Sequence, residues 1–300
     1  MNQTSNTGRE IWTGEDKKQF LLTLSFADAS IIELESLEKL QRLEFKILAA
    51  KSGTALIECT DLAAYRLISR IGGAYKISRV LAQDLSSAME AMVVPFNEKF
   101  DWTVSGYECS SEMLSDAKDT LREFFKSRGL GRSKFLEPDI FSNFGEKVKV
   151  SEINAREVRS RIIHPEDERE GVDLVVHGDL LRKPVYAQTV ETTNYLSYEE
   201  RDLMRPYQDP TKTLNPRIAR MLVNMAVTSE NARLLDPFCG LGTILQEALI
   251  CRCDVVGVDR DQRNIRMTRE NLQWTKRKYK LGSEETNLFA YDARRISSAR

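Results

Sequence analysis

The sequence predicts an α/β protein with a doubly wound parallel sheet in its C-terminal third. Three strand-like runs lie there, at 234–236, 254–259 and 287–293, and helical patterns separate them. The aspartates Asp236, Asp259 and Asp292 are expected to end the three strands. Strands that alternate with helices form parallel sheets. Gly240 and Gly242 follow the first run, where the strand gives way to a helix. Because open α/β sheets bind ligands at the carboxyl ends of their strands, we expect a ligand site at this edge.

The first 98 residues form a separate α+β unit in this interpretation. Apolar patterning predicts four strands, at 20–26, 45–50, 55–60 and 75–81. The second and third strands join across Lys51-Ser52-Gly53, a hairpin turn signal. One helix has apolar residues at every third position from Ile31, and another begins on the capping residue Asp61 and stops at Gly72. The order β-α-β-β-α-β is that of a ferredoxin-like motif.

A second unit is expected over residues 99–190. Strand-like runs lie at 101–108, 171–179 and 184–191. Residues 110–129 form a strong helical pattern, with serines at its start and Gly129 after its last turn. The stretch 138–169 is irregular and rich in charge. These features fit a second mixed α/β module.

The third unit, residues 191–300, contains the parallel sheet. Its first helix begins at Asn215, an N-cap residue with proline at the next position. An apolar stripe is expected along this helix, formed by Ile218, Met221, Leu222 and Met225. The chain reaches Arg300 after three strands of the expected sheet, so we expect the domain to be incomplete.

Composition gives only broad limits on function. Lys and Arg (44) nearly balance Asp and Glu (45), so any site for nucleic acid must be a local patch. No apolar run approaches the length of a membrane span, and the polar N-terminus lacks a signal-peptide core. The five scattered cysteines indicate reduced thiols, and Cys251-x-Cys253 lacks the second ligand pair that zinc needs. We therefore expect a cytoplasmic protein without a metal site.

The glycine turn discriminates between three ligands. A phosphate-binding P-loop needs a Gly-Lys-Ser/Thr ending, which is absent, and the dinucleotide motif needs a third glycine, where Leu245 stands instead. S-adenosylmethionine fits better. Asp236 can take its amino group, Asp259 can accept both ribose hydroxyls, and Asp292 ends the third strand near the expected adenine. An acid at the end of each of three successive strands is more specific than the glycines alone.

The segment "DPFCGLGTI", preceded by "RPYQDPTKTLNPRIARMLVNMA" and followed by "VVGVDRDQRNIRMTRENLQ", resembles the THUMP-domain RNA methyltransferases. It is most similar to the archaeal and eukaryotic branch that makes N2-methylguanosine in tRNA. The resemblance implies a ferredoxin-like domain, a THUMP-like RNA-binding domain and a Rossmann-like methyltransferase domain, in that order. It also implies S-adenosyl-L-methionine as cofactor, tRNA or another structured RNA as substrate, and a small activating protein subunit as a candidate partner.

By this resemblance, the cofactor site has three parts. Thr213, Asp236, Phe238, Gly240 and Gly242 hold the methionine end, Asp259 the ribose and Asp292 the adenine. The neighbouring positions Cys239, Thr243, Arg260 and Ala293 complete the predicted site. Members of the family also carry a D/N-P-P-Y/F tetrapeptide that holds the target amine. It does not occur in these 300 residues, so we expect a fragment and assign no catalytic residue.

Alternatives to this hypothesis stay open. A DNA adenine-N6 methyltransferase uses the same tetrapeptide, and a non-catalytic RNA-binding or scaffold protein could keep a cofactor-binding domain. Cys239 could be a nucleophile, but a small side chain in a tight loop is favoured because it lacks a His or Asp partner motif. The two histidines, His164 and His177, are expected on the surface or in turns.

Two basic clusters are candidates for contact with RNA phosphates. One lies near the proposed THUMP-like helix and consists of Arg122, Lys126, Arg128, Arg132 and Lys134. The other lies between Arg260 and Lys280, where a solvated helix face is an equal alternative. We favour the first cluster, because the resemblance implies an RNA-binding module there.

Overall fold

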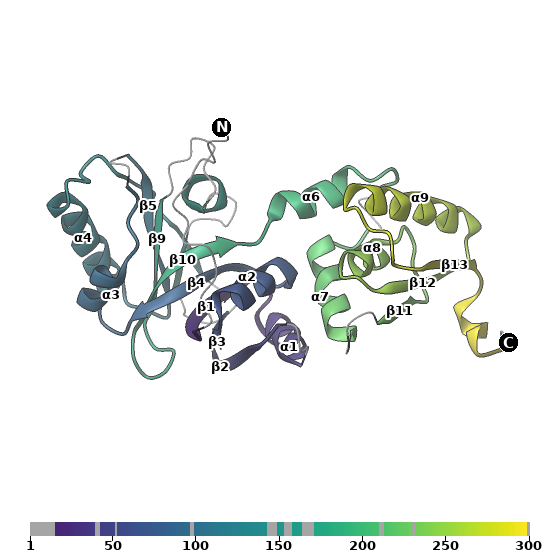
Figure 1. Ribbon diagram of the computed structural model, residues 1–300, viewed down its shortest axis with the longest axis horizontal. Helices are drawn as coiled ribbons and strands as arrows, with labels where there is room; N and C mark the ends of the chain where they lie inside the picture. Colours follow the sequence, from purple (N-terminus) through teal and green to yellow (C-terminus); the bar gives the residue numbers. More distant parts are fainter. Residues whose placement is uncertain are drawn as a thin grey trace, which may run out of the picture.

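The computed structural model describes residues 16–39, 43–51, 53–96, 99–142, 149–152, 158–163, 171–209, 213–227, 229 and 232–298. Two sheets form its framework. A large mixed sheet belongs to the N-terminal part, and a three-stranded parallel sheet belongs to the C-terminal part. The chain passes from one to the other through helix α6 (Tyr195–Leu203), which follows the last strand of the large sheet (Figure 1). This confirms the predicted α/β class with its C-terminal parallel sheet.

The N-terminal part begins with the predicted β-α-β-β-α-β order. Its elements are β1 (Lys18–Leu24), α1 (Ala27–Glu38), β2 (Phe45–Lys51), β3 (Thr54–Cys59), α2 (Asp61–Arg70) and β4 (Ala74–Ala82). The strands are antiparallel in the spatial order β2-β3-β1-β4. The predicted cap of α2 is wrong: the Thr60 side chain caps the helix by accepting from the Ala63 N–H, and Asp61 is the first helical residue.

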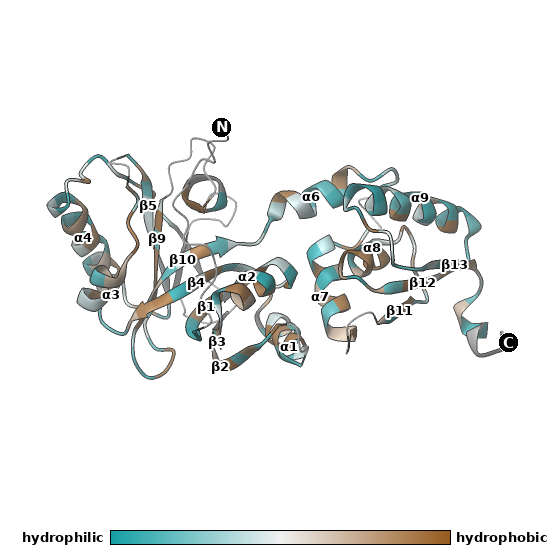
Figure 2. Ribbon diagram, in the orientation of Figure 1, coloured by the Kyte–Doolittle hydropathy of each residue, from teal (hydrophilic) through white to brown (hydrophobic). Residues whose placement is uncertain are grey.

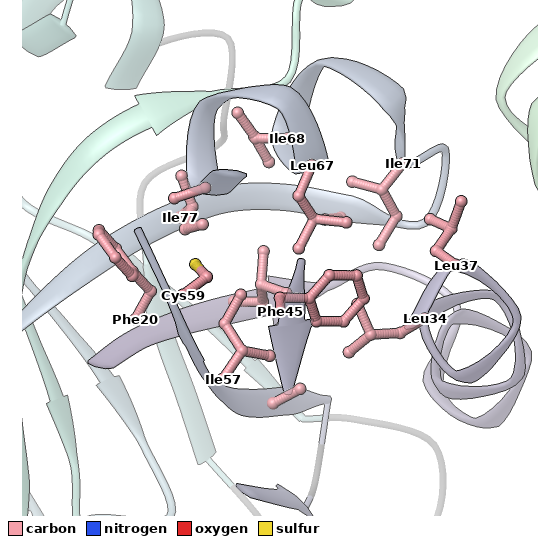
Figure 3. Close-up of a cluster of buried hydrophobic side chains, with 14 of the residues drawn as sticks. Phe20, Leu34, Leu37, Phe45, Ile57, Cys59, Leu67, Ile68, Ile71 and Ile77 are labelled. Atoms are coloured by element: carbon pink, nitrogen blue, oxygen red, sulfur yellow. The ribbon is translucent and has the colours of Figure 1, made fainter. Parts of the chain in front are cut away.

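Both helices pack on one face of these strands. The shared core gathers strand residues such as Phe20, Ile57 and Ile77 against Leu34 of α1 and Leu67 of α2 (Figure 3). Burying these apolar side chains is the main favourable free energy of this part of the fold. Phe26, predicted in the first strand, instead precedes α1 and is 36% exposed.

The large sheet continues beyond β4 into the second predicted unit. Its further elements are α3 (Leu85–Ala91), β5 (Asp101–Tyr107), α4 (Ser111–Ser127), β6 (Lys134–Phe135), β7 (Asp139–Ser142), β8 (Lys149–Glu152), the π-helical η1 (Arg159–Ile163), β9 (Val172–His177) and β10 (Val185–Thr192). Strand β10 pairs with β4 on one side and with β9 on the other. The first two predicted units therefore share one sheet.

Helix α4 follows the predicted boundaries closely. The Ser110 hydroxyl caps it by accepting from the Met113 N–H, and Gly129 has a φ of +76° just after its end. Its inner side packs on the apolar face of β5 and β9, around Trp102 and Phe125. His177 is not a surface or turn residue, since it ends β9 and is fully buried; His164 lies outside the described residues.

The C-terminal part is a parallel sheet of β11 (Arg233–Asp236), β12 (Asp254–Asp259) and β13 (Thr286–Ala290). Its helices are α7 (Pro216–Ala226), α8 (Thr243–Ile250), α9 (Gln262–Lys278) and the 3₁₀ turn η2 (Ala293–Ser298). The predicted N-cap is confirmed, because the Asn215 side chain accepts from the Arg217 N–H. Helix α9 is mainly hydrophilic (Figure 2).

Helix α7 buries only part of the predicted stripe, in which Met221 is buried as expected. Leu222 is 42% exposed and Ile218 is only partly buried, while Ala219, Arg220, Val223 and Asn224 are buried. The helix contacts α8 on one side and α1 of the N-terminal part on the other. The buried polar residues have partners on both sides, because Arg220 bonds to Glu247 of α8 and Asn224 bonds to Glu33 of α1. Apolar periodicity does not reveal this pattern.

The contact between the two parts is a network of buried hydrogen bonds. Asn224 of α7 donates to Glu33 of α1 at 2.6 Å and accepts from Arg70 of α2 at 2.7 Å. Arg217 donates to the Gly72 carbonyl oxygen at 2.9 Å.

Within the residues described, no helix is both long and apolar enough to cross a bilayer.

Candidate functional site

The carboxyl edge of the parallel sheet brings two of the three predicted acids together. Asp236 ends β11 and Asp259 ends the adjacent strand β12. The loop from Pro237 to Gly242 folds over this edge, because the Gly240 N–H donates to Asp259 Oδ2 at 3.1 Å. The sequence places these residues 23 positions apart, and the parallel pairing makes them neighbours.

The glycines are required by the backbone of this loop. Gly240 and Gly242 have φ values of +51° and +85°, a region that strains residues with a Cβ. A Cβ on Gly242 would also lie 2.7 Å from Thr268 Cγ2 of α9, whereas one on Gly240 would meet nothing within 4 Å. Space is therefore open above Gly240, where a ligand can approach the backbone.

Asp259 is held in place by three N–H donors. Its Oδ1 accepts from the Asp261 N–H at 2.8 Å and from Asn264 Nδ2 at 3.2 Å, and its Oδ2 accepts from Gly240. Each carboxylate oxygen can accept more than one hydrogen bond. The carboxylate is thus fixed in orientation and retains acceptor capacity for hydroxyl groups of a ligand.

Asp236 is the more buried of the two acids. It is 8% exposed, and its Oδ1 accepts from the Phe238 N–H at 3.1 Å. Burial raises the pKa of Asp236, and the nearby negative charge of Asp259 raises it further. A cationic group placed between the two carboxylates would relieve this repulsion.

The third predicted acid, Asp292, lies just beyond the third strand. The preceding residue, Tyr291, donates its N–H to the Asp259 carbonyl oxygen at 3.0 Å, which keeps this segment at the same edge. The Asp292 carboxylate is paired with Arg294, with a shortest distance of 2.6 Å, and this hydrogen bonding lowers its pKa to about 2. Ala293 begins η2 directly after it.

The other predicted site residues divide into two groups. Thr243 opens α8 at the end of the loop, and Phe238 projects from the loop with 76% exposure. Thr213 instead donates its hydroxyl to the Asp209 carbonyl oxygen, and Arg260 is exposed after β12; neither has a bond to the acids within the residues described. The structure therefore groups most of the predicted residues at one edge.

Cys239 lies in the loop but does not have the properties of a nucleophile. Its side chain is buried beneath the loop, and its N–H donates to the Val258 carbonyl oxygen at 2.9 Å. Burial raises the pKa of its thiol to about 12, so the thiolate is scarce at neutral pH. The small side chain fills the space beside Gly257, as the favoured alternative predicted.

Three supporting residues were not predicted. Thr268 donates to the Gly240 carbonyl oxygen at 2.6 Å, and Asn271 donates to that of Leu241 at 2.9 Å, so α9 holds the loop from below. Arg205, 2% exposed, donates to Thr243 Oγ1 at 2.8 Å. Thr268 and Asn271 are polar residues on the buried side of α9, and that departure from apolar periodicity was the available signal.

The predicted RNA-binding cluster lies on α4 and the segment after it. Arg122 pairs with Asp119 at 2.9 Å and Lys126 with Glu123 at 2.6 Å, so acids of the same helix offset two of its charges. Arg128 stacks over the Phe124 ring at 4.4 Å. Lys134 begins β6, and Arg132 lies in the turn before it.

A parallel sheet with carboxylates at the ends of adjacent strands, beneath a glycine loop, is typical of Rossmann-like methyltransferases. Comparison with known proteins agrees, because the RMKL-like methyltransferase domain family matches residues 203–288. Two solved structures share the fold. A possible methylase from Clostridium difficile 630 has a TM-score of 0.51 at 13% identity, covering 95% of this chain and 78% of that one. TrmN from Thermus thermophilus has a TM-score of 0.50 at 15% identity, covering 94% and 76%.

Curated relatives narrow the class to a family. The tRNA (guanine(10)-N2)-dimethyltransferase of Methanothermobacter thermautotrophicus is 30% identical over 263 residues, which cover 84% of this chain and 67% of the relative. The enzyme of the same name from Methanocaldococcus jannaschii is 33% identical over 109 residues, 34% of this chain and 31% of the relative. The chain therefore belongs to the tRNA (guanine-N2) methyltransferase family.

Proposed function

We propose that this protein methylates the exocyclic N2 of a guanosine in tRNA, with S-adenosyl-L-methionine as the methyl donor. The observation that carries the proposal is the pair Asp236 and Asp259 beneath an open glycine loop, in a chain of this family. When bound, S-adenosylmethionine supplies an electrophilic methyl group on a sulfonium. The residues of the chain bind it, orient it and complement its charge.

The residues at the sheet edge fit this cofactor. Asp236 is buried, carries a raised pKa and lies close to a second carboxylate, so it favours a cationic partner such as the α-amino group. Asp259 is oriented by three N–H donors and keeps acceptor capacity for two ribose hydroxyls. The open space above Gly240 lets the ligand approach the backbone.

We assign residues to the adenine and methionine ends of the cofactor by their proximity to Asp236 and Asp259. Asp292 would accept from the adenine amino group, which requires its exposed pair with Arg294 to open or shift. Surface ion pairs cost little to break, about 0–1 kcal/mol. At the other end, Thr243 lies at the start of α8, where backbone N–H groups and Arg205 favour an anion such as the methionine carboxylate. We retain Thr213, Phe238, Cys239, Arg260 and Ala293 as neighbours of the site.

The N-terminal part is proposed to bind the RNA. We divide the chain into residues 1–98, a ferredoxin-like domain, residues 99–190, a THUMP-like domain, and residues 191–300, the methyltransferase domain. The basic cluster on α4 and the segment after it remains the proposed tRNA contact; Arg122 and Lys126 have acids of the same helix as partners, and Arg128 stacks on Phe124. A small activating subunit is a candidate partner. The five free cysteines support a cytoplasmic location.

The main contribution of the chain to the reaction is the orientation of the two reactants. Proximity and alignment of two reactants can supply about 7–11 kcal/mol of a barrier. The guanine must leave the helical stack to present its amine, as other base-modifying enzymes require. The carboxylates at the sheet edge fix the donor on one side, and the bound RNA positions the amine on the other.

The test is transfer of a labelled methyl group from S-adenosylmethionine to tRNA, followed by nucleoside analysis. N2-methylguanosine or its dimethyl form is the expected product. Methylated adenine in DNA would replace this proposal with the alternative enzyme. Binding of cofactor and tRNA with no methylated nucleoside would favour the scaffold alternative.

A further inference from the structure

A cavity of about 220 Å³ lies where the two parts of the molecule meet. Its walls come from η1, from α2 and the end of β10 in the N-terminal part, and from helices α6 to α9 in the C-terminal part. Six polar residues among its lining carry the argument: Ser69, Arg159, Asn194, Ser197, Arg201 and Tyr279. The cavity does not touch the loop of the cofactor site, so it is a separate feature.

Arginines dominate the charged residues described in the lining of this cavity. Arg201 and Arg220 share a single buried carboxylate, Glu247, at 2.6 and 2.8 Å. Arg159 pairs with Glu191 at 3.1 Å. Among the described residues that line the cavity, three are arginines, Arg159, Arg201 and Arg220, and one is a carboxylate, Glu191, so this lining is rich in positive charge. Since buried charges are unfavourable unless compensated, an anion is the ligand that this arrangement favours.

Two side chains of the lining have hydrogen-bond donors to spare. Arg159 is anchored through Nη1 alone, which donates to Glu191 and to the carbonyl and hydroxyl oxygens of Thr192. Asn194 uses its Oδ1 to cap α6, since it accepts from the Ser197 N–H. Arg159 Nε and Nη2 and Asn194 Nδ2 have no partner among the described residues. An arginine edge of this kind binds a phosphate through two parallel hydrogen bonds.

We propose that this junction cavity binds a backbone phosphate of the RNA substrate. The proposal rests on the function proposed above and adds a contact to it. The cavity has room for a phosphate group, and both the N-terminal part and the methyltransferase part contribute its walls. The cavity thus lies between the part proposed to hold the RNA and the part proposed to receive its base. Arg, Asn, Ser and Tyr side chains are common phosphate partners in such complexes.

Two substitutions test the cavity from opposite walls. Asn194→Asp keeps an efficient N-cap on α6 but places a carboxylate in the cavity. Ser69→Asp adds the same charge from the exposed side of α2. Ser110→Asp is the matched control, because it also adds one negative charge at a helix N-cap but lies at the far end of α4 from the basic cluster.

The measurements are tRNA affinity over a range of salt and S-adenosylhomocysteine affinity by calorimetry, both on the full chain. Each cavity variant should bind tRNA about tenfold more weakly, and the slope of log affinity against log salt should fall by about 0.7–0.9, the value for one phosphate. Affinity for S-adenosylhomocysteine should not change. The Ser110→Asp protein should resemble the unaltered chain in both assays.

The possible failures are distinguishable. Unchanged tRNA affinity and salt slope in both cavity variants would overturn the cavity proposal alone. If the unaltered chain did not bind tRNA, the RNA-binding function and the cavity proposal would both be wrong. Calorimetry with inorganic phosphate identifies a third outcome. If Asn194→Asp abolished phosphate binding but left tRNA affinity unchanged, the cavity would be a site for free phosphate, and the assignment to RNA would be overturned.

Discussion

Asp236 and Asp259, the proposed cofactor-binding residues, illustrate how such residues can oppose stability. Both carboxylates lie at one sheet edge, and Asp236 is buried with a raised pKa. Its ionised form is therefore less favourable in the folded chain than in the unfolded chain. The contribution of Asp236 to stability is greatest below its unfolded pKa and is lost as the pH rises through its raised folded pKa. At a pH above its raised folded pKa, the free site carries this unfavourable contribution in full.

Asp236→Asn should therefore stabilise the free chain at neutral pH while weakening cofactor binding. We expect S-adenosylhomocysteine affinity to fall about tenfold, because one charge-assisted hydrogen bond becomes a neutral one. Thermal unfolding and calorimetry measure the two effects. In the unaltered chain, affinity should also fall as the pH is lowered through the raised pKa of Asp236, and this dependence should be absent in the variant. A variant that loses both stability and affinity would contradict this role.

At the scale of elements, the strand-loop-helix unit positions the site. Gly242 ends the loop in a left-handed conformation, and Thr268 of α9 packs against it and bonds to Gly240. Helix α9 thus determines the height of the loop above β11 and β12. The two glycines have different structural roles. Gly242 leaves room for Thr268, whereas Gly240 faces open space among the described residues.

Alanine substitutions separate these two roles. Gly240→Ala should lower the free energy of unfolding by about 1–2 kcal/mol, the cost of an alanine in the left-handed conformation. Gly242→Ala should lower it more, because its Cβ also meets Thr268 Cγ2 at 2.7 Å. Adding Thr268→Ser to Gly242→Ala removes that methyl group, keeps the hydroxyl and should recover part of the loss. Urea denaturation measures all three proteins, and equal losses for the two single variants would argue against the packing explanation.

Most elements could be predicted from local patterns, but their assembly could not. The capping Asn215 and the strand-ending acids were visible in the sequence, because caps and strand ends have local signals. The pairing of β4 with β10 was not, since it joins residues more than 100 positions apart. Buried polar residues such as Asn224, Thr268 and Arg205 were missed for a related reason: their partners lie on distant elements.

At the scale of the whole molecule, the two sheets are joined by polar contacts and each has its own core. The clusters around Phe20 and Trp102 belong to the large sheet, and a third cluster belongs to the parallel sheet. Between them, Glu33 accepts from the Gly72 and Gly73 N–H groups and from Asn224. Because such buried bonds are directional, they fix how the N-terminal part is oriented toward the proposed cofactor edge.

The stability of the large sheet should depend on pH through His177. Burial lowers its pKa to about 4, and its Nε2 is a buried atom with no hydrogen-bond partner among the residues that the structure describes. The neutral form is favoured by folding, so its contribution is present above the unfolded pKa of about 6.5 and is lost as the pH falls through about 4. Between pH 7 and 4 the unaltered chain should lose up to about 3 kcal/mol more than His177→Gln. If the free energies of unfolding of the two proteins changed in parallel between pH 7 and 4, this role of His177 would be refuted.

The proposed RNA surface predicts an order of effects. Charge reversal at Arg128 and Arg132 should weaken tRNA binding more than reversal at Lys278 and Lys280, and Lys278 already pairs with Glu200 at 2.5 Å. Each lost phosphate contact should reduce the salt slope by about 0.7–0.9. Filter binding at several salt concentrations measures both quantities. The opposite order would move the RNA contact to α9.

The central claim is that the carboxyl edge of the parallel sheet binds S-adenosylmethionine, and β12 offers a matched test. The strand begins with Asp254 and ends with Asp259, so an alanine at either position removes one carboxylate from the same strand. Calorimetry with S-adenosylhomocysteine should show a loss of about 1.5–3 kcal/mol for Asp259→Ala and no change for Asp254→Ala. Equal affinities in the two variants, both folded, would contradict the claim.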